Sequence, residues 1–348
     1  NNKHPIEFKL TGIKPKPWKV QDVLAWGRVM TWTLSHGWSG ALTRQAILEK
    51  VGSEMAEELS IIYPENNPVE IPIGIDINSL EIDEKFNSAK GPFLGKDMEG
   101  GGRGSNAWAV SPEKSSTGRP VLCNDTHLVL STPGIWYLNH LHSKEGFHCM
   151  GLTIPGLPGV LLGHNEDIAW GITLAFTDVE DIFVEKVDVT NPQKYEYMGE
   201  SLDFELIEEI IQVKGADDHV EKIQYTVHGP LIGSVTEHSG QAIALCSKSL
   251  QLNTILEGFL NLNIANNWDD FTKGVKKIMA PQLNITYADI QGNIGLYISG
   301  RVPIRKNGYG NLPAPGWSGD YDWESEIPHE EMPHVSNPKC GYIISCNH

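Results

Sequence analysis

The sequence predicts a protein of the α+β class, in which a short helical region precedes a large strand-rich body. Three observations lead to this prediction. Residues 20–59 have the apolar spacing of helices, residues 63–104 have no clear periodicity, and short β-rich runs follow one another closely from Ser105 onward. The regular alternation of strands and helices that marks parallel βαβ folds is not found.

The helical region consists of two amphipathic stretches. Apolar residues recur three and four positions apart in QDVLAWGRVMTW and in GALTRQAILEKVGSEMAEELS, and Pro64 closes the region. We therefore expect a pair of helices within a helical segment of residues 1–65.

The connection that follows, residues 66–104, is rich in Pro, Asn and Gly and ends in the run EGGGRG. A connection this long with so little periodicity is usually functional or disordered. It is expected to act as a linker to a strand-rich segment of residues 105–348.

Strands are predicted throughout this last segment, with one helix at NWDDFTKGVKKIM. DIQGNIGLYISG alternates about a Gly-containing turn and predicts a hairpin. The predicted strand runs are NAWAVSP, PVLCND, GVLLGHN, IAWGIT, DIFVEKVDV, IQYTVHG, AIALCS, ITYADIQGNIGLYISGRVPI and GYIISC.

Composition excludes several classes of partner. The formal net charge of −17 over 348 residues argues against nucleic acid and against an anionic membrane surface. No apolar run approaches the roughly 18 residues of a membrane-spanning helix, so membrane insertion is not expected. The five cysteines include no CxxC pair, which argues against a disulfide framework and a zinc knuckle. The chain has no initiator Met and stops in a predicted strand, so we expect a fragment or a processed form.

Common catalytic and metal motifs are missing. The sequence has no G-x-S-x-G elbow and no H-E-x-x-H, and GGGRG lacks the Lys-Ser/Thr of a phosphate loop. In NHLHSKEGFH, His140 and His142 would share one face of a strand, with His148 close by. Two histidines on one face could ligate a metal, but without an acidic or Cys partner at ligand spacing, surface or hydrogen-bonded histidines are the expected interpretation.

The step from glycine-rich linker to predicted strand falls at Gly104-Ser105. A Ser hydroxyl is a weak nucleophile unless a base lies beside it. If the chain were cut before Ser105, the freed α-amine, with a reference pKa of roughly 7.7 to 8.0, could take the hydroxyl proton. The glycine before it would permit the backbone geometry that an N-to-O acyl shift needs.

A series of ordered motifs begins with PIEFKLTGIKPKPWKVQDVLAWGRVMTW and covers nearly the whole chain. It continues with GRGSNAWAV, GRPVLCNDTHLVLSTPGIWY, GLTIPGLPGVLLGHNEDIAWGIT, DVEDIF, VHGPLI, LPAPGWSGDYDWES and NPKCGYIISCNH. In this order the motifs resemble the penicillin G acylase family of serine N-terminal-nucleophile hydrolases, which includes acyl-homoserine lactone and cephalosporin acylases.

The resemblance implies a four-layer αββα sandwich, here incomplete at the C-terminus, and self-cleavage between Gly104 and Ser105. Residues 66–104 would be the spacer that is lost or loosened, after which the α and β segments stay associated. The resemblance also implies that the reaction itself needs no cofactor.

Family roles can be carried over residue by residue. Ser105 matches the nucleophile, and Asn347 matches an asparagine of the oxyanion hole. The backbone N–H of Leu174 would be the second donor, and His127 would orient the amine. A histidine held in a strand-end hydrogen bond is the alternative for His127. Two positions depart from the family pattern: Thr126 replaces proline, and His348 replaces the second residue of an Asn-Asn pair.

The resemblance also implies a structural calcium ion and an acyl pocket. Calcium would be held by Asp178, Asp181 and the carbonyl of Glu180, but the expected glutamate of the α segment falls near Ala41. A solvated acidic turn is the alternative. The acyl pocket would be lined by aliphatic residues, which favours an aliphatic acyl chain over phenylacetyl, or these residues are simply core: Leu128, Leu162, Ile172 and Leu283.

The function implied is an amide-bond hydrolase that releases an acyl group from an N-acylated small molecule, such as a β-lactam or an acyl-homoserine lactone. The alternative is a catalytically silent family member that binds acylated ligands. The resemblance also implies a periplasmic or secreted location.

Overall fold

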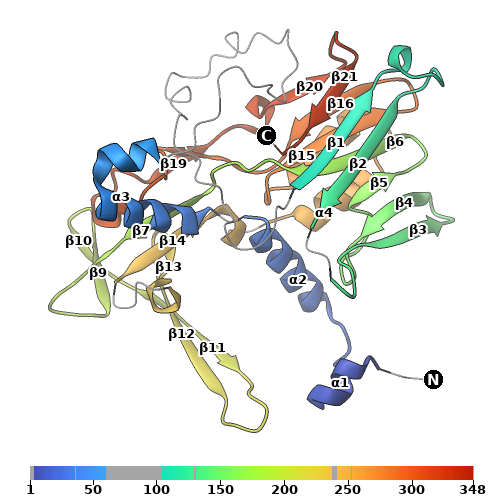
Figure 1. Ribbon diagram of the computed structural model, residues 1–348. Helices are drawn as coiled ribbons and strands as arrows, with labels where there is room; N and C mark the ends of the chain where they lie inside the picture. Colours follow the sequence, from blue (N-terminus) through green and yellow to red (C-terminus); the bar gives the residue numbers. More distant parts are fainter. Residues whose placement is uncertain are drawn as a thin grey trace.

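The fold mixes helices with several β-sheets. A computed structural model describes residues 4–35, 37–59, 104–128, 131–236, 241–251 and 253–347 (Figure 1). The predicted spacer lies outside the described residues except for Gly104, and so does His348. The helices are α1 (Ile6–Thr11), α2 (Val20–Thr33), α3 (Trp38–Glu58), α4 (Ile255–Asn263) and α5 (Trp268–Lys277). No described helix combines the length and apolarity that crossing a membrane requires.

The predicted helix pair is present as α2 and α3, and the predicted C-terminal helix as α5. Within α3, Gly52 has a φ of 77° that interrupts the helical backbone, a value that glycine adopts at little cost. The sequence analysis missed α4. Its nine residues include Gly258, Asn261 and Asn263, which have low helix propensity.

The largest sheet has seven antiparallel strands, in the order β20-β16-β15-β6-β5-β4-β3. The hairpin predicted at DIQGNIGLYISG is confirmed, because β15 and β16 pair across a turn that begins at Asp289. The strands are β3 (Tyr137–Ser143), β4 (Phe147–Thr153), β5 (Leu162–His164), β6 (Ile168–Leu174), β15 (Leu283–Asp289), β16 (Ile294–Ile298) and β20 (His334–Ser336).

A three-stranded sheet packs on one face of this large sheet. It has the order β2-β1-β21, with β1 (Gly104–Val110), β2 (Val121–His127) and β21 (Tyr342–Ser345). Ala109 and Ile343 point inward and pack against Ala288, Ile294 and Leu296 of the large sheet. Two sheets therefore meet face to face across an apolar layer.

Helices α4 and α5 cover the opposite face of the large sheet. Phe259 and Phe271 from these helices join a buried cluster with Trp170 and Tyr287. The described residues thus form a helix layer and two sheet layers. On the outer side of the small sheet, Trp108 is exposed, so a fourth layer remains a prediction.

Smaller sheets extend from this body. The predicted run DIFVEKVDV forms two strands with Glu185 between them, and the hairpin β11–β12 projects away from the body (Figure 1). The remaining strands are β7 (Glu180–Val184), β8 (Lys186–Val187), β9 (Lys194–Tyr197), β10 (Glu200–Asp203), β11 (Glu205–Ile211), β12 (His219–Thr226), β13 (Gly229–Pro230), β14 (Ile243–Ser247), β17 (Pro303–Arg305), β18 (Ala314–Pro315) and β19 (Trp323–Glu326).

Candidate active site

Ser105 lies near the start of β1 and points between the two stacked sheets. It pairs with Thr126 of β2 and shares its face of β1 with the buried residues Ala107 and Ala109. Its Oγ donates to the carbonyl oxygen of Gly104 over 2.7 Å. Its backbone N–H donates to Oδ1 of Asn347 over 2.5 Å. Both the hydroxyl and the nitrogen of Ser105 are therefore held in place.

Asn347 joins the nucleophile candidate to the large sheet. It follows β21, is only 5% exposed, and has a φ of 75°, a left-handed conformation that Asn tolerates better than most residues. Its Nδ2 donates to the carbonyl oxygen of Leu174 over 3.1 Å. An amide nitrogen carries two hydrogens, so the second N–H can donate to another oxygen in this space.

The backbone N–H of Leu174 faces the same side as Asn347. The next residue, Ala175, donates its N–H to Gln282 O over 3.0 Å. The backbone groups of Ala175 therefore point to the side of β6 on which β15 lies. Groups alternate sides along a strand. The N–H and C=O of Leu174 therefore point away from β15, and the two predicted oxyanion donors lie on one side of β6.

His127 lies beside Gly104 rather than beside Ser105. It pairs with Gly104 in the register of β1 and β2, on the face opposite Ser105 and Thr126. Its imidazole is 53% exposed, and Nε2 contacts a carboxylate oxygen of Asp125. In this arrangement Asn347 holds the Ser105 nitrogen, and a role for His127 in orienting the amine stays a prediction.

Asn124, which the sequence analysis did not select, connects β1, β2 and β6. Its Nδ2 donates to Asn106 O over 2.8 Å and to Ile172 O over 2.9 Å, while its Oδ1 accepts from Ile172 N over 2.9 Å. A Cβ at Gly171 would lie 2.7 Å from the Cβ of Asn124, so glycine permits this close approach. An Asn inside a predicted strand was the available signal, because Asn is depleted in strands.

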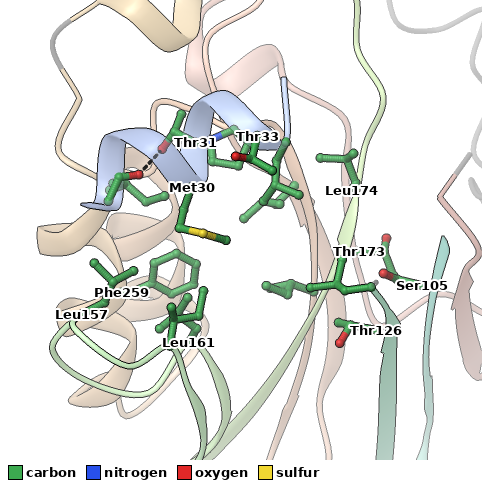
Figure 2. A pocket seen from close by; sticks show the side chains of 18 of the residues that line it. Met30, Thr31, Thr33, Ser105, Thr126, Leu157, Leu161, Thr173, Leu174 and Phe259 are labelled. Carbon is green, nitrogen blue, oxygen red and sulfur yellow. Dashed lines mark hydrogen bonds between the residues drawn. The ribbon is translucent and has the colours of Figure 1, made fainter. Parts of the chain in front are cut away.

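An apolar pocket of about 110 Å³ opens beside Ser105. Figure 2 shows Met30 of α2 and Phe259 of α4 across the space from Ser105 and Thr126. Its lining comes from six helices and strands and the loops between them. The described lining residues are Gly27, Met30, Thr31, Thr33, Leu34, Gly104, Ser105, Thr126, Leu128, Trp136, Ile154, Leu157, Pro158, Leu161, Ile172, Thr173, Leu174, Phe176, Ile255, Leu256, Phe259, Pro281, Leu283 and Asn347.

Three of the four predicted acyl-pocket residues, Leu128, Ile172 and Leu283, line this pocket. Leu162 is not among the described lining residues; it is buried in the core, and its neighbour Leu161 lines the pocket instead. Adjacent residues of an extended chain point to opposite sides, so an alignment shifted by one position exchanges the two.

The pocket also holds aromatic side chains, which the four aliphatic positions did not predict. Trp136, Phe176 and Phe259 all line it, although most of its other apolar residues are aliphatic. The loop before β3, the segment that follows β6 and helix α4 bring these rings in from parts of the chain that are distant in the sequence. Sequence reasoning missed them because it considered only positions that matched the family's pocket.

The acidic turn predicted to hold calcium is engaged by protein donors. Asp181 accepts from Nε and Nη2 of Arg305, each over 2.7 Å, and from the indole N–H of Trp323 over 2.5 Å. Asp178 lies 3.4 Å from the same guanidinium. Burial alone would lower the pKa of Arg305, but its hydrogen bonds and the charges of both aspartates raise it.

The carboxylate of Glu180 accepts hydrogen bonds from other segments of the chain. It accepts from Gly37 N, from Trp38 N over 3.2 Å at the start of α3, and from Ser247 Oγ over 2.9 Å. Ala41, where a glutamate ligand was expected, is buried and carries no ligand atom on its side chain. The described residues include no group of three or more His, Cys, Asp or Glu side chains able to hold a metal. As arranged, the acidic turn does not fit calcium.

Comparisons with known proteins agree with this architecture. The penicillin amidase family model matches residues 1–348. An acyl-homoserine lactone acylase QuiP from Pseudomonas aeruginosa is 29% identical over 100% of this chain and 43% of its own length. Penicillin acylase 2 proenzyme from Pseudomonas sp. strain SE83 is 33% identical over 99% of this chain and 45% of its own length.

A solved structure of a thermostable penicillin G acylase from Alcaligenes faecalis superimposes with a TM-score of 0.64 at 31% identity, covering 70% of this chain and 44% of that one. The chain thus spans less than half the length of these relatives. The match along its whole length, together with the shared fold, shows that the chain belongs to the penicillin amidase family.

Proposed function

We propose that this chain carries the nucleophile, both oxyanion donors and much of the acyl pocket of an amide-bond hydrolase. The reaction would release an acyl group from an N-acylated small molecule of the β-lactam or acyl-homoserine lactone type. One observation carries the proposal. Ser105 and Asn347 are hydrogen-bonded to each other beside an apolar pocket, and the Leu174 N–H points to the same side of β6 as the Leu174 carbonyl that accepts from Asn347.

Activation would be a self-cleavage of the Gly104–Ser105 bond. Ser105 Oγ, which lies 2.7 Å from Gly104 O, would attack the carbonyl carbon of Gly104, and its proton would pass to the departing Ser105 nitrogen. The resulting ester would be hydrolysed by water, leaving a carboxylate on Gly104 and a free amine and hydroxyl on Ser105.

In turnover, the freed amine would act as the base. It takes the Oγ proton while Oγ attacks the substrate carbonyl, and the developing oxyanion accepts from the Asn347 side chain and the Leu174 N–H. The amine then returns the proton to the leaving nitrogen, which departs. Water hydrolyses the acyl-serine by the same proton route. Each oxyanion donor is expected to contribute about 3 to 4 kcal/mol.

The acyl chain would extend from Ser105 toward Met30 and Phe259. Because α2 supplies part of the pocket wall, the segments on either side of the cleavage must stay associated for the site to exist. We also infer, from the family resemblance, a completed four-layer sandwich and a periplasmic or secreted location.

Intact-mass analysis of the folded chain tests the proposal. We expect two species that separate between Gly104 and Ser105, and loss of both cleavage and acyl-amide hydrolysis in Ser105→Ala. Ser131→Ala is the matched control, because its hydroxyl also donates to a backbone carbonyl, that of Pro133, over 2.9 Å but does not line the pocket. A folded wild-type chain that stays uncut and inactive would support the silent, ligand-binding alternative.

A further inference from the structure

Three histidines lie on one exposed face of the β3–β4 hairpin, away from the pocket. In the register of this hairpin His142 pairs with His148, and His140 pairs with Met150. Paired residues share a face, and so do residues two apart on one strand. His140, His142 and His148 are therefore on the same side of the sheet edge, a juxtaposition that the sequence shows only for the first two.

His148 lies between the rings of His140 and His142, both tilted relative to it, and a carboxylate contacts this central ring. His140 Nε2 and His148 Nε2 are 2.7 Å apart, and the ring centroids of His142 and His148 are 4.9 Å apart. On its other nitrogen, Nδ1, His148 lies 3.1 Å from Oε1 of Glu166, which follows β5. Glu166 is the acidic partner that the spacing of the histidine motif did not reveal.

The carboxylate of Glu166 favours a proton on Nδ1 of His148, because a carboxylate oxygen lies 3.1 Å from that nitrogen and attracts the N–H. With Nδ1 protonated, Nε2 presents a lone pair toward His140. A carboxylate behind a histidine is the usual outer-shell arrangement at metal sites, where it orients the ring and raises its basicity.

We propose that His140 and His148 bind a divalent transition-metal ion, such as Zn²⁺, Ni²⁺ or Cu²⁺, through their Nε2 atoms. Imidazole ligands suit these ions. Glu166 would support His148, and water would complete the coordination. Bonds of about 2.0 to 2.1 Å at a tetrahedral angle require the two nitrogens to be roughly 3.3 Å apart. The exposed His140 side chain can move outward by this small difference.

Other histidines with carboxylate partners lack this combination. His219 contacts Glu221 over 2.9 Å, and among the residues that the structure describes no second imidazole contacts it. His228 has both ring nitrogens engaged by carboxylates, Glu185 and Asp322. The net charge of −17 also favours a cation at the surface.

Calorimetric titration of the full chain with NiCl₂ tests the site. We expect one binding event in the wild type that is lost in His140→Gln and in His148→Gln. Glu166→Gln should retain the event with an affinity lower by about 10- to 100-fold. His219→Gln removes a comparable exposed histidine with a carboxylate partner and should leave the event unchanged. Any weak binding elsewhere should be the same in the wild type and in all four variants.

Wild-type affinity in either His140→Gln or His148→Gln would overturn the proposal, as would a wild-type chain that shows no binding event. A wild-type chain without a binding event would mean that the imidazoles of His140 and His148 are only hydrogen-bonded to each other. Thermal unfolding of each variant verifies that it is folded. Amide hydrolysis should not change in His140→Gln, so the metal site and the proposed catalytic function can fail independently.

Discussion

The side chain of Asn124 binds both backbone groups of Ile172, as a neighbouring strand would. Strand β5 pairs with β6 only as far as Trp170, so the end of β6 has no strand partner on that side among the described residues. Asn124 fills the place with hydrogen bonds of 2.9 Å to Ile172 N and Ile172 O. It thereby sets the distance between the strand of Ser105 and the strand of Leu174.

Replacing Asn124 with Ala should impair catalysis more than binding. The proposed oxyanion donor at Leu174 lies two residues beyond Ile172, so freeing this strand end should lower kcat at least tenfold and change KM little. Stability should fall by about 2 kcal/mol, because two backbone groups lose their partner. Asn139→Ala, which removes a 2.8 Å bond to Thr153 at the sheet edge, is the control and should leave kcat unchanged. A proportionate rise in KM instead would contradict a positioning role.

Replacing Asn347 with Asp tests the oxyanion hole. Aspartate keeps the oxygen that accepts from Ser105 N but loses the N–H donors, so kcat should fall by about 10²- to 10³-fold with KM nearly constant. Steady-state kinetics on a chromogenic acyl amide measure both. Asn337→Asp is a matched control, since Asn337 also has a positive φ, of 49°, but lies outside the pocket lining. Full activity in Asn347→Asp would exclude this residue from the oxyanion hole.

Chain length of the acyl group should determine the rate. Each methylene buried in the pocket contributes about 0.8 kcal/mol, so kcat/KM should rise roughly fourfold per added carbon until the chain reaches Met30 and Phe259. Met30→Ala should move this optimum to longer chains, whereas Met55→Ala, at an exposed position on α3, should not. Rates for a series of linear acyl amides and for phenylacetyl amide test this. Faster release of phenylacetyl would refute the aliphatic preference.

Stability should depend on pH through His228. The ring is 6% exposed, bonds Glu185 over 2.8 Å and Asp322 over 3.1 Å, and stacks on Phe183. Burial would lower its pKa, but the two carboxylates raise it overall. A raised pKa in the folded state means that the stabilisation is complete below about pH 6.5, the unfolded value, and is lost as pH rises through the folded pKa.

The measurement is the free energy of unfolding in urea for wild type and His228→Gln. At pH 6 the variant should be less stable by about 3 to 5 kcal/mol, because the charge of Glu185 stays buried without its partner. This difference should narrow as pH rises. His219→Gln is the exposed control and should show almost no difference. A stability difference between wild type and His228→Gln that grows as pH rises would contradict the assignment of His228 and Glu185 as an ion pair.

Arg305 should make the acidic turn independent of added metal. Because Asp181 already accepts from the guanidinium, EDTA should leave the wild-type Tm unchanged. Arg305→Met should lose about 3 to 5 kcal/mol, since it leaves a buried carboxylate unpaired. Arg301→Met, whose 3.5 Å contact with Glu326 is partly exposed, should lose less than about 1 kcal/mol. A fall in the wild-type Tm on addition of EDTA would support calcium binding at this turn and contradict the prediction.

Periodic patterns predicted the local structure well. The spacing in α2, α3 and α5 and the alternation around the β15–β16 turn are properties of neighbouring residues, and all four elements are present. Helix α4 was missed because its nine residues include Gly258, Asn261 and Asn263, which have low helix propensity. The pocket was predicted in part, and Leu161 replaces Leu162 because a shift of one position reverses the direction of a side chain.

The sequence by itself determined the helical and strand-rich regions, the candidate serine and its resemblance to a known family. Only the tertiary structure decided which side chains meet. Asn347 reaches Ser105 from 242 positions away, Asn124 holds Ile172, Arg305 occupies the acidic turn, and Glu166 lies behind His148. The physical reason is that local spacing determines secondary structure, whereas contacts between distant strands depend on sheet order and register, which no short segment encodes.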